Sequence, residues 1–181
     1  MIVLNNVGIM KKCNLWINEY PNVEYDCLKE LNGVIVKDSW LAWDSVFYMI
    51  EINLKQRHSS NYALLGMSYK HDDTGELEIK VNSSGEDGKI IENTLVSKSD
   101  EVHSGIPLEY SEEILKRAMD LLNNVDCSSG TITFDIGGHG YVGSSSAIFG
   151  TASEILLKIL INNNKNDIQK IEKIVFNQLN S

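Results

Sequence analysis

The alternation of apolar and polar residues predicts a series of β-strands through the middle of the chain. Residues 49–54 and 76–81 alternate with a period of two, which is typical of strands with one buried face. Residues 61–70 are apolar enough for a further strand. Residues 71–75 predict a hairpin turn, because Asp and Gly tolerate the positive φ of such turns. Another strand is expected over residues 89–96.

Apolar residues spaced three and four positions apart predict helices in the last part of the chain. Residues 109–123 place one set of apolar side chains on a single face: Ile114, Leu115, Ala118, Leu121 and Leu122. Further helices are expected at residues 146–160 and 167–179. Residues 131–136 alternate as the strand that precedes these two helices.

The order of these elements predicts an α+β fold with a mostly antiparallel sheet, covered on one face by two to three helices. Near the N-terminus, residues 23–31 predict a short helix, ended by Asn32-Gly33, and residues 33–37 predict a strand. The 181 residues suffice for one domain with an extension. We divide the chain into an N-terminal extension or subdomain, residues 1–54, and an α+β domain, residues 55–181.

Acidic residues are concentrated in the middle of the chain. The net charge is −9, and residues 61–126 hold 14 acidic and 6 basic side chains. Nucleic-acid binders usually carry the opposite sign, because neutralising phosphates supplies most of their non-specific affinity. The charge therefore favours a basic protein partner, although acidic residues also serve simply to keep a protein soluble.

Composition excludes several other classes of protein. Hydrophobic residues make up 43% of the chain, which is enough for a buried core. No run of about 18 apolar residues occurs, so no transmembrane helix is expected, and residues 1–6 do not resemble a secretory signal. The three cysteines, Cys13, Cys27 and Cys127, are odd in number and widely spaced. This spacing argues against a disulfide framework or a zinc site and favours the cytoplasm.

Groups suited to catalysis are scarce. None of the four histidines lies at metal-ligand spacing from another histidine or a cysteine, and the serines lack the Gly-x-Ser-x-Gly nucleophile motif. We therefore expect no catalytic residue, no metal and no cofactor. A glycine-serine loop before the helix at 146–160 could hold an anion through the backbone of Gly140, Gly143, Ser144 and Ser145. The serines also suit a helix N-cap, and we favour that role.

The block Gly105-Ile106-Pro107-Leu108-Glu109-Tyr110, followed by a long helix, resembles domain IV of bacterial elongation factor G. That domain carries Ile-Pro-x-Glu-Tyr before its helix, and the similarity of pattern extends over about residues 56–160. The resemblance implies a β-α-β core with two tip loops. Two features depart from the family: the first tip loop, from Arg57, lacks glycine, and Gly143 stands near the position of an acid in the second. No GTPase phosphate-loop motif is present, so the resemblance does not extend to translocation activity.

The segment from Gly138 to Ala147 is also similar, with one extra residue, to the Gly-x-Gly-Leu-Gly-Ser-Ser-Ala-Ala phosphate loop of the GHMP small-molecule kinases. Those kinases are much longer, and their substrate-binding half has no counterpart here. Since the two families share a related core, both resemblances can reflect one fold, and a shared fold does not establish a shared function.

These observations favour a non-enzymatic, acidic, cytoplasmic binding protein. The most concrete version is an immunity protein that neutralises a basic bacterial toxin. The residues expected to contact the partner are acids and two loop residues: Asp72, Asp73, Glu76, Glu78, Glu86, Asp87, His139 and Tyr141. Two alternatives remain. One is a translation-associated factor that contacts the ribosome through its tip loops. The other is a nucleotide-binding protein or GHMP-like kinase relative that uses residues 138–146.

Overall fold

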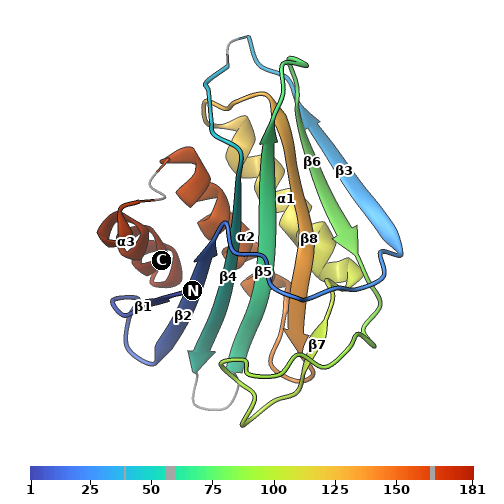
Figure 1. The fold of residues 1–181 in the computed structure, drawn as a ribbon, viewed down its shortest axis with the longest axis vertical. Coiled ribbons are helices and arrows are strands. Elements are labelled where there is room, and N and C mark those ends of the chain that lie inside the picture. Colours follow the sequence, from blue (N-terminus) through green and yellow to red (C-terminus); the bar gives the residue numbers. More distant parts are fainter. Residues whose placement is uncertain (39, 56–59, 164–165) are drawn as a thin grey trace.

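The chain forms an α+β structure around one mixed, mostly antiparallel, open sheet (Figure 1). The computed structural model describes residues 1–38, 40–55, 60–163 and 166–181. The described strands are β1 (Ile2–Leu4), β2 (Lys11–Ile17), β3 (Lys29–Ile35), β4 (Val46–Lys55), β5 (Ser60–His71), β6 (Leu77–Ser83), β7 (Val102–Ser104) and β8 (Gly130–Gly140). The described helices are α1 (Leu108–Asn123), α2 (Ser146–Ile161) and α3 (Ile168–Leu179).

Strand β8 lies between two strands that are consecutive in sequence. The order across the sheet is β1-β2-β4-β5-β8-β6-β3, and β7 pairs with the end of β8. Gly130, at the start of β8, is opposite both His71 of β5 and Leu77 of β6. The turn predicted at residues 71–75 is present, but it is not a hairpin turn, because the strands it joins are separated by β8.

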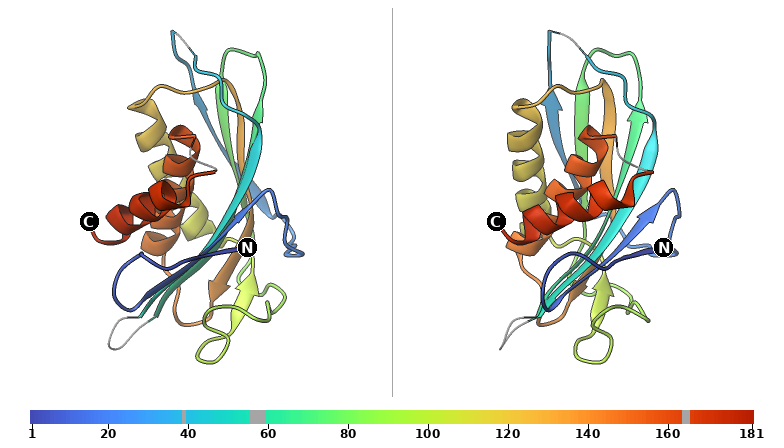
Figure 2. Two further views of the ribbon diagram at one scale, coloured as in Figure 1. Left: turned by 60° about the vertical axis from the view of Figure 1, so that its left-hand side comes forward. Right: turned by 90° about the vertical axis from the view of Figure 1, so that its left-hand side faces the viewer.

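The connection from β6 to β8 is left-handed. The two strands are parallel, and the chain between them passes through β7 and α1. In Figure 1 both strands run downward with β8 on the left of β6, and Figure 2 shows that α1 returns behind the sheet. Connections of this kind are right-handed in about 98% of cases, so the hand is an unusual property of this fold.

All three helices cover the same face of the sheet (Figure 2). The inward face of α1 buries Ile114, Ala118 and Leu122, and α2 buries apolar side chains along most of its length. The helices predicted at 109–123, 146–160 and 167–179 are confirmed. So are the strands predicted at 49–54, 61–70, 76–81 and 131–136. None of the described helices is both long and apolar enough to cross a membrane.

Residues 1–54, expected as an extension or subdomain, contribute β1, β2, β3 and most of β4 to this sheet. Strand β2 pairs with β4 along its whole length, and Leu4 and Leu15 belong to the same core as α2 and α3. The carboxylate of Glu172 in α3 accepts hydrogen bonds from Asn5 N at 2.9 Å and Asn6 Nδ2 at 2.8 Å. The two ends of the chain therefore pack together on one scaffold.

None of the described helices lies on the opposite face of the sheet. That face is crossed by residues 18–28 and by the loop between β6 and β7, which bury a second, smaller apolar cluster: Phe47, Met49, Tyr62, Leu64, Val96 and Val102. As a result β4 is buried on both faces over its first eight residues. This helix-free face positions the candidate site.

Two local predictions near this face are wrong. Residues 23–28 are not helical, and residues 29–35 form β3, where Gly33 pairs with Ile79 of β6. A Cβ at Gly33 would lie 2.5 Å from Met119 Sδ of α1, so this glycine allows close packing rather than ending a helix. Residues 89–96 are not a strand either; only Ile90 forms an isolated bridge, to His103.

Candidate functional site

Two adjoining cavities lie on the helix-free face, where residues 21–28 and 84–94 cross the sheet. Their volumes are about 470 Å³ and 570 Å³, and they share Glu24, Lys89 and Ser104 in their walls. We call the two together the acidic groove, because six carboxylates line it: Glu24, Asp26, Glu51, Glu86, Asp87 and Glu92. Lys89 is the single basic residue among the described residues that line it. The groove is therefore strongly negative.

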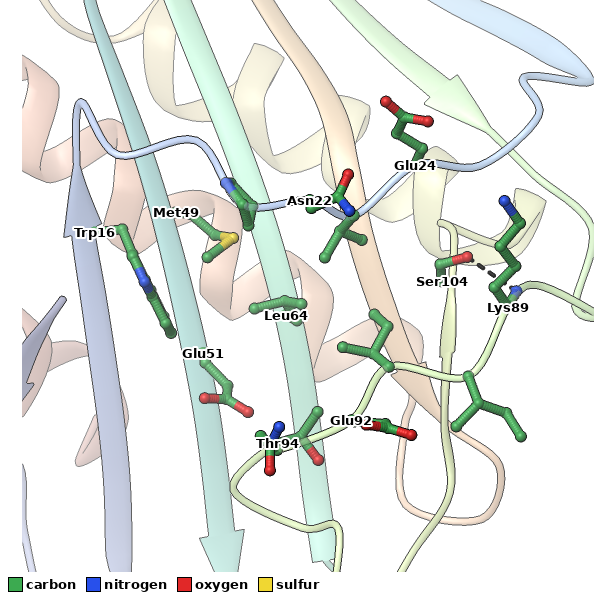
Figure 3. A pocket seen from close by; sticks show the side chains of 15 residues that line it. Trp16, Asn22, Glu24, Met49, Glu51, Leu64, Lys89, Glu92, Thr94 and Ser104 are labelled. Carbon is green, nitrogen blue, oxygen red and sulfur yellow. Dashed lines mark hydrogen bonds between the residues drawn. The ribbon is translucent and has the colours of Figure 1, made fainter.

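Backbone and side-chain contacts hold the crossing segment over the sheet. Tyr25 Oη donates to the carbonyl of Asn82 at 2.8 Å, and Leu28 N donates to the carbonyl of Ser83 at 2.8 Å. On the other side of the groove, Lys89 N donates to Ser104 Oγ at 3.1 Å (Figure 3). These bonds anchor both loops to strand ends, so the acids they carry have a defined place.

Glu51 forms the floor of the smaller cavity, which we call the Glu51 pocket. It lies on β4, opposite Asn14 of β2 and Leu64 of β5, and its side chain is 4% exposed. Its Oε2 accepts a hydrogen bond from Asn14 Nδ2 at 3.0 Å. Its Oε1 accepts from Tyr62 Oη at 3.0 Å and from Leu95 N at 2.7 Å. Donors therefore hold this carboxylate in one position.

The charge of Glu51 affects its neighbours. The pKa of Tyr62 is raised well above its usual value, first by burial and then by the nearby Glu51 carboxylate. Burial and Glu51 also raise the pKa of the Cys13 thiol. Both groups stay neutral at physiological pH, so the Tyr62 hydroxyl keeps its proton and donates a hydrogen bond to the Glu51 carboxylate.

The acids predicted to contact a partner do not form one patch. Asp72, Asp73, Glu76 and Glu78 lie at or near the turn between β5 and β6, whereas Glu86 and Asp87 follow β6 at its other end. The seven residues of β6 separate the groups by roughly 20 Å. Of the six predicted acids, the acidic groove includes Glu86 and Asp87.

The acids at the turn have partners within the chain. Asp72 accepts a hydrogen bond from Thr74 N at 3.1 Å, and its bonds to Thr74 lower its pKa. His71 Nε2 lies 3.3 Å from the carboxylate of Asp73. Glu78 pairs with Lys80 at 3.3 Å, both on β6. The observed contacts of this group are with the turn itself and with neighbouring side chains.

His139 and Tyr141 differ sharply in exposure. His139 is 6% exposed, and its Nδ1 and Nε2 lie 3.3 Å and 3.2 Å from the carbonyl oxygens of Gly105 and Glu86. Burial lowers its pKa, so the neutral form is favoured. Tyr141 is 79% exposed at the loop tip. His139 therefore contacts the loop that carries Glu86 from inside the fold, whereas the side chain of Tyr141 lies at the surface next to the ring of His103.

The glycine-serine loop uses its donors internally. Gly140 N donates to Ser144 Oγ at 2.8 Å, and Gly143 N donates to Asp100 Oδ2 at 2.9 Å. Ser145 caps α2 by accepting a hydrogen bond from Ile148 N, which confirms the predicted capping role. Of the groups proposed to bind an anion, the N–H groups of Gly140 and Gly143 and the hydroxyls of Ser144 and Ser145 thus have partners within the chain.

Four carboxylates of the groove were missed at the sequence level: Glu24, Asp26, Glu51 and Glu92. Glu51 carried a usable signal, because it is the single acid in its strand and follows five consecutive apolar residues, 46–50. Glu24, Asp26 and Glu92 gave no such signal. The segments that carry them were predicted to be a helix or a strand, and the structure shows irregular loops there.

The described residues contain no group of three or more His, Cys, Asp or Glu side chains that could hold a metal ion. Arg57, in the first tip loop implied by the elongation factor resemblance, lies outside the described residues. No protein-family model matches the chain, and no curated protein or solved structure matches it. Function must therefore be inferred from the residues of this chain.

Proposed function

We propose that the protein is a non-enzymatic binding protein whose acidic groove receives a basic segment of a protein partner. In its most concrete form it is an immunity protein that neutralises a basic bacterial toxin in the cytoplasm. The observation that carries this proposal is the composition of the groove, in which six carboxylates and one lysine line two adjoining cavities. Such a surface attracts cationic partners and orients them as they approach.

The edges of the groove support a protein rather than a free ion as the ligand. Leu28 and Ile90 line its walls and are 72% and 58% exposed. Exposed apolar side chains beside charged ones are typical of protein interfaces, whose centres are apolar and whose rims are polar. A partner that covers the groove would bury Leu28 and Ile90 while its basic residues meet the carboxylates.

The two alternative functions receive less support. In the glycine-serine loop, the N–H groups of Gly140 and Gly143 have partners within the chain and Ser145 caps α2, which counts against a nucleotide phosphate at this loop. The second tip loop, residues 141–145, carries no basic residue to meet ribosomal RNA.

The proposal is tested with a fluorescent peptide of alternating arginine and glycine as the probe. We expect binding that weakens as salt is raised. In a variant with Glu24→Gln, Glu86→Gln, Asp87→Asn and Glu92→Gln, affinity should fall by about tenfold, since each exposed charge contributes a fraction of a kcal/mol. The matched control neutralises four acids elsewhere: Asp72→Asn, Asp73→Asn, Glu76→Gln and Glu112→Gln. Equal losses in both variants would mean that only net charge matters and that the groove is not the site.

A further inference from the structure

Glu51 is a buried carboxylate whose hydrogen-bond donors in the described structure are all uncharged. It is 4% exposed and accepts three hydrogen bonds. In the part of the chain that the structure describes, no basic side chain forms an ion pair with it. Figure 3 shows Lys89 at the far end of the pocket from Glu51. Buried charges in proteins are normally paired, because desolvating an unpaired one is costly.

Open space adjoins this carboxylate, and apolar side chains form part of the walls around that space. The Glu51 pocket has a volume of about 470 Å³, and its lining includes Trp16, Met49, Leu64 and Ile91. Trp16 is directly opposite Met49 in the β2–β4 register, and Glu51 is two residues further along the same face of β4. Trp16 and Glu51 are therefore diagonal neighbours, a separation that an aromatic side chain can span.

The combination of one carboxylate and one indole selects among cations. A hard metal ion needs several oxygen ligands close together. Glu51 is the one buried carboxylate of the pocket, whereas Glu24 and Glu92 are exposed in its walls, and the described residues contain no group of three or more acids, histidines or cysteines that could hold a metal ion. A lysine ammonium is strongly hydrated and makes poor use of an aromatic wall. A guanidinium is flat and weakly hydrated, and it can stack on an indole while it donates to a carboxylate.

We infer that the Glu51 pocket receives one arginine side chain of the partner, with its guanidinium donating to Glu51 and stacking on Trp16. The arginine stem would lie between Met49 and Ile91, which suits its aliphatic carbons. The Oε2 of Glu51 accepts a hydrogen bond from Asn14 and retains capacity for a further donor. This inference rests on the proposed function, because it names the chemistry of the residue that the groove would anchor.

The test uses Nα-acetyl-arginine amide as the probe and the full chain as the receptor. The indole N–H signal of Trp16 is followed by NMR and assigned from its loss in Trp16→Leu. We expect a saturable shift with the arginine compound. The uncharged citrulline analogue should give none, and the lysine compound a weaker one. Equal shifts from citrulline and arginine would overturn the inference.

Two variants locate the site. Glu51→Gln keeps the shape of the side chain and should weaken arginine binding by about 30-fold or more, because it removes one half of a buried charge pair. Glu78→Gln removes an acid on β6 outside the Glu51 pocket and should bind as the parent does. If circular dichroism shows that Glu51→Gln does not fold, Trp16→Leu is used in its place. Loss of the indole should also weaken arginine binding, which is then followed through the other NMR signals that shift. Unchanged affinity in whichever variant folds contradicts the inference.

The failure of this inference is distinguishable from that of the proposed function. If the arginine-glycine peptide still requires the four groove acids but the arginine compound does not bind at Glu51, the groove remains a binding site and the arginine pocket is wrong. If neutralising the four groove acids leaves the affinity for the peptide unchanged while the arginine compound binds at Glu51, the pocket is a small-molecule site and the protein-binding proposal fails.

Discussion

The carboxylate of Asp100 lies against the backbone of Gly143 and accepts a hydrogen bond from its N–H at 2.9 Å. Val142 N lies 3.3 Å and 3.4 Å from the two oxygens of the same carboxylate. A glycine-serine loop that resembles a phosphate loop thus holds an anion, but the anion belongs to the chain itself. The Asp100 carboxylate packs closely against this loop, because a Cβ added at Gly140 would lie 2.3 Å from Asp100 Oδ2.

Asp100→Ala should destabilise the fold and create an affinity for small anions. Removing the carboxylate leaves three backbone donors, Glu101 N, Val142 N and Gly143 N, without their acceptor. Hydrogen bonds to charged groups contribute about 1.5–3 kcal/mol each when buried. We expect a loss of about 1–2 kcal/mol for this partly exposed site. The measurement is urea unfolding with and without phosphate. Phosphate should restore part of the lost free energy of unfolding in the variant.

Asp126→Ala is the matched control, because it removes an exposed acid near α1 and should change the free energy of unfolding by less than about 0.5 kcal/mol. If phosphate stabilises Asp100→Ala no more than it stabilises the parent, the loop does not act as an anion site even when it is emptied.

Gly130→Ala should be far more damaging than Gly75→Ala, although both glycines have positive φ. At Gly130 φ is +141° and a Cβ would lie 2.2 Å from the carbonyl oxygen of Lys70, where β8 enters between β5 and β6. At Gly75 φ is +77° and a Cβ would meet nothing within 4 Å. We expect losses of about 3 kcal/mol or more and about 1 kcal/mol, respectively, in urea unfolding. Similar losses at both positions would contradict the steric explanation.

Much of the secondary structure was predictable because periodicity is a local property. Helix α1 and strand β6 each show one apolar face in sequence and bury that face in the structure. The order of strands was not predictable in the same way. Strand β8 separates β5 from β6, and this insertion depends on contacts between residues such as Gly130 and His71 that lie 59 positions apart.

The site was less predictable than the fold. Glu86 and Asp87 were expected to contact a partner and do line the acidic groove, but their group was expected to include acids at the opposite end of β6. Glu51 was read only as part of an alternating strand. Its burial arises because residues 18–28 and the β6–β7 loop cover the outer face of β4. Such coverage is a tertiary property that no local pattern reveals.

His139 should make the fold less stable as the pH falls. Burial holds its pKa in the folded state below the usual value of about 6.5. Below that pH the unfolded chain takes up a proton that the folded chain does not, so the free energy of unfolding decreases until the folded pKa is passed. His103 and Glu86 are the nearest titratable groups that act on it. His139→Gln should reduce this decrease, as measured by urea unfolding at pH 7.5 and 5.5. An unchanged pH dependence in the variant would assign the effect to other groups.

Tyr62→Phe should destabilise the fold by about 1.5–3 kcal/mol, because Glu51 would lose one of the donors that stabilise its buried charge. The ring remains, so packing against Leu64 and Val96 in the second apolar cluster is kept and the change isolates the hydroxyl. The control is Tyr141→Phe, at a side chain that is 79% exposed, where we expect a change of less than about 0.5 kcal/mol. A double-mutant cycle with Glu51→Gln gives the coupling directly. If Tyr62→Phe costs as much in the Glu51→Gln background as in the parent, the charge of Glu51 adds nothing to its bond with Tyr62, since the amide oxygen of a glutamine can also accept from the hydroxyl.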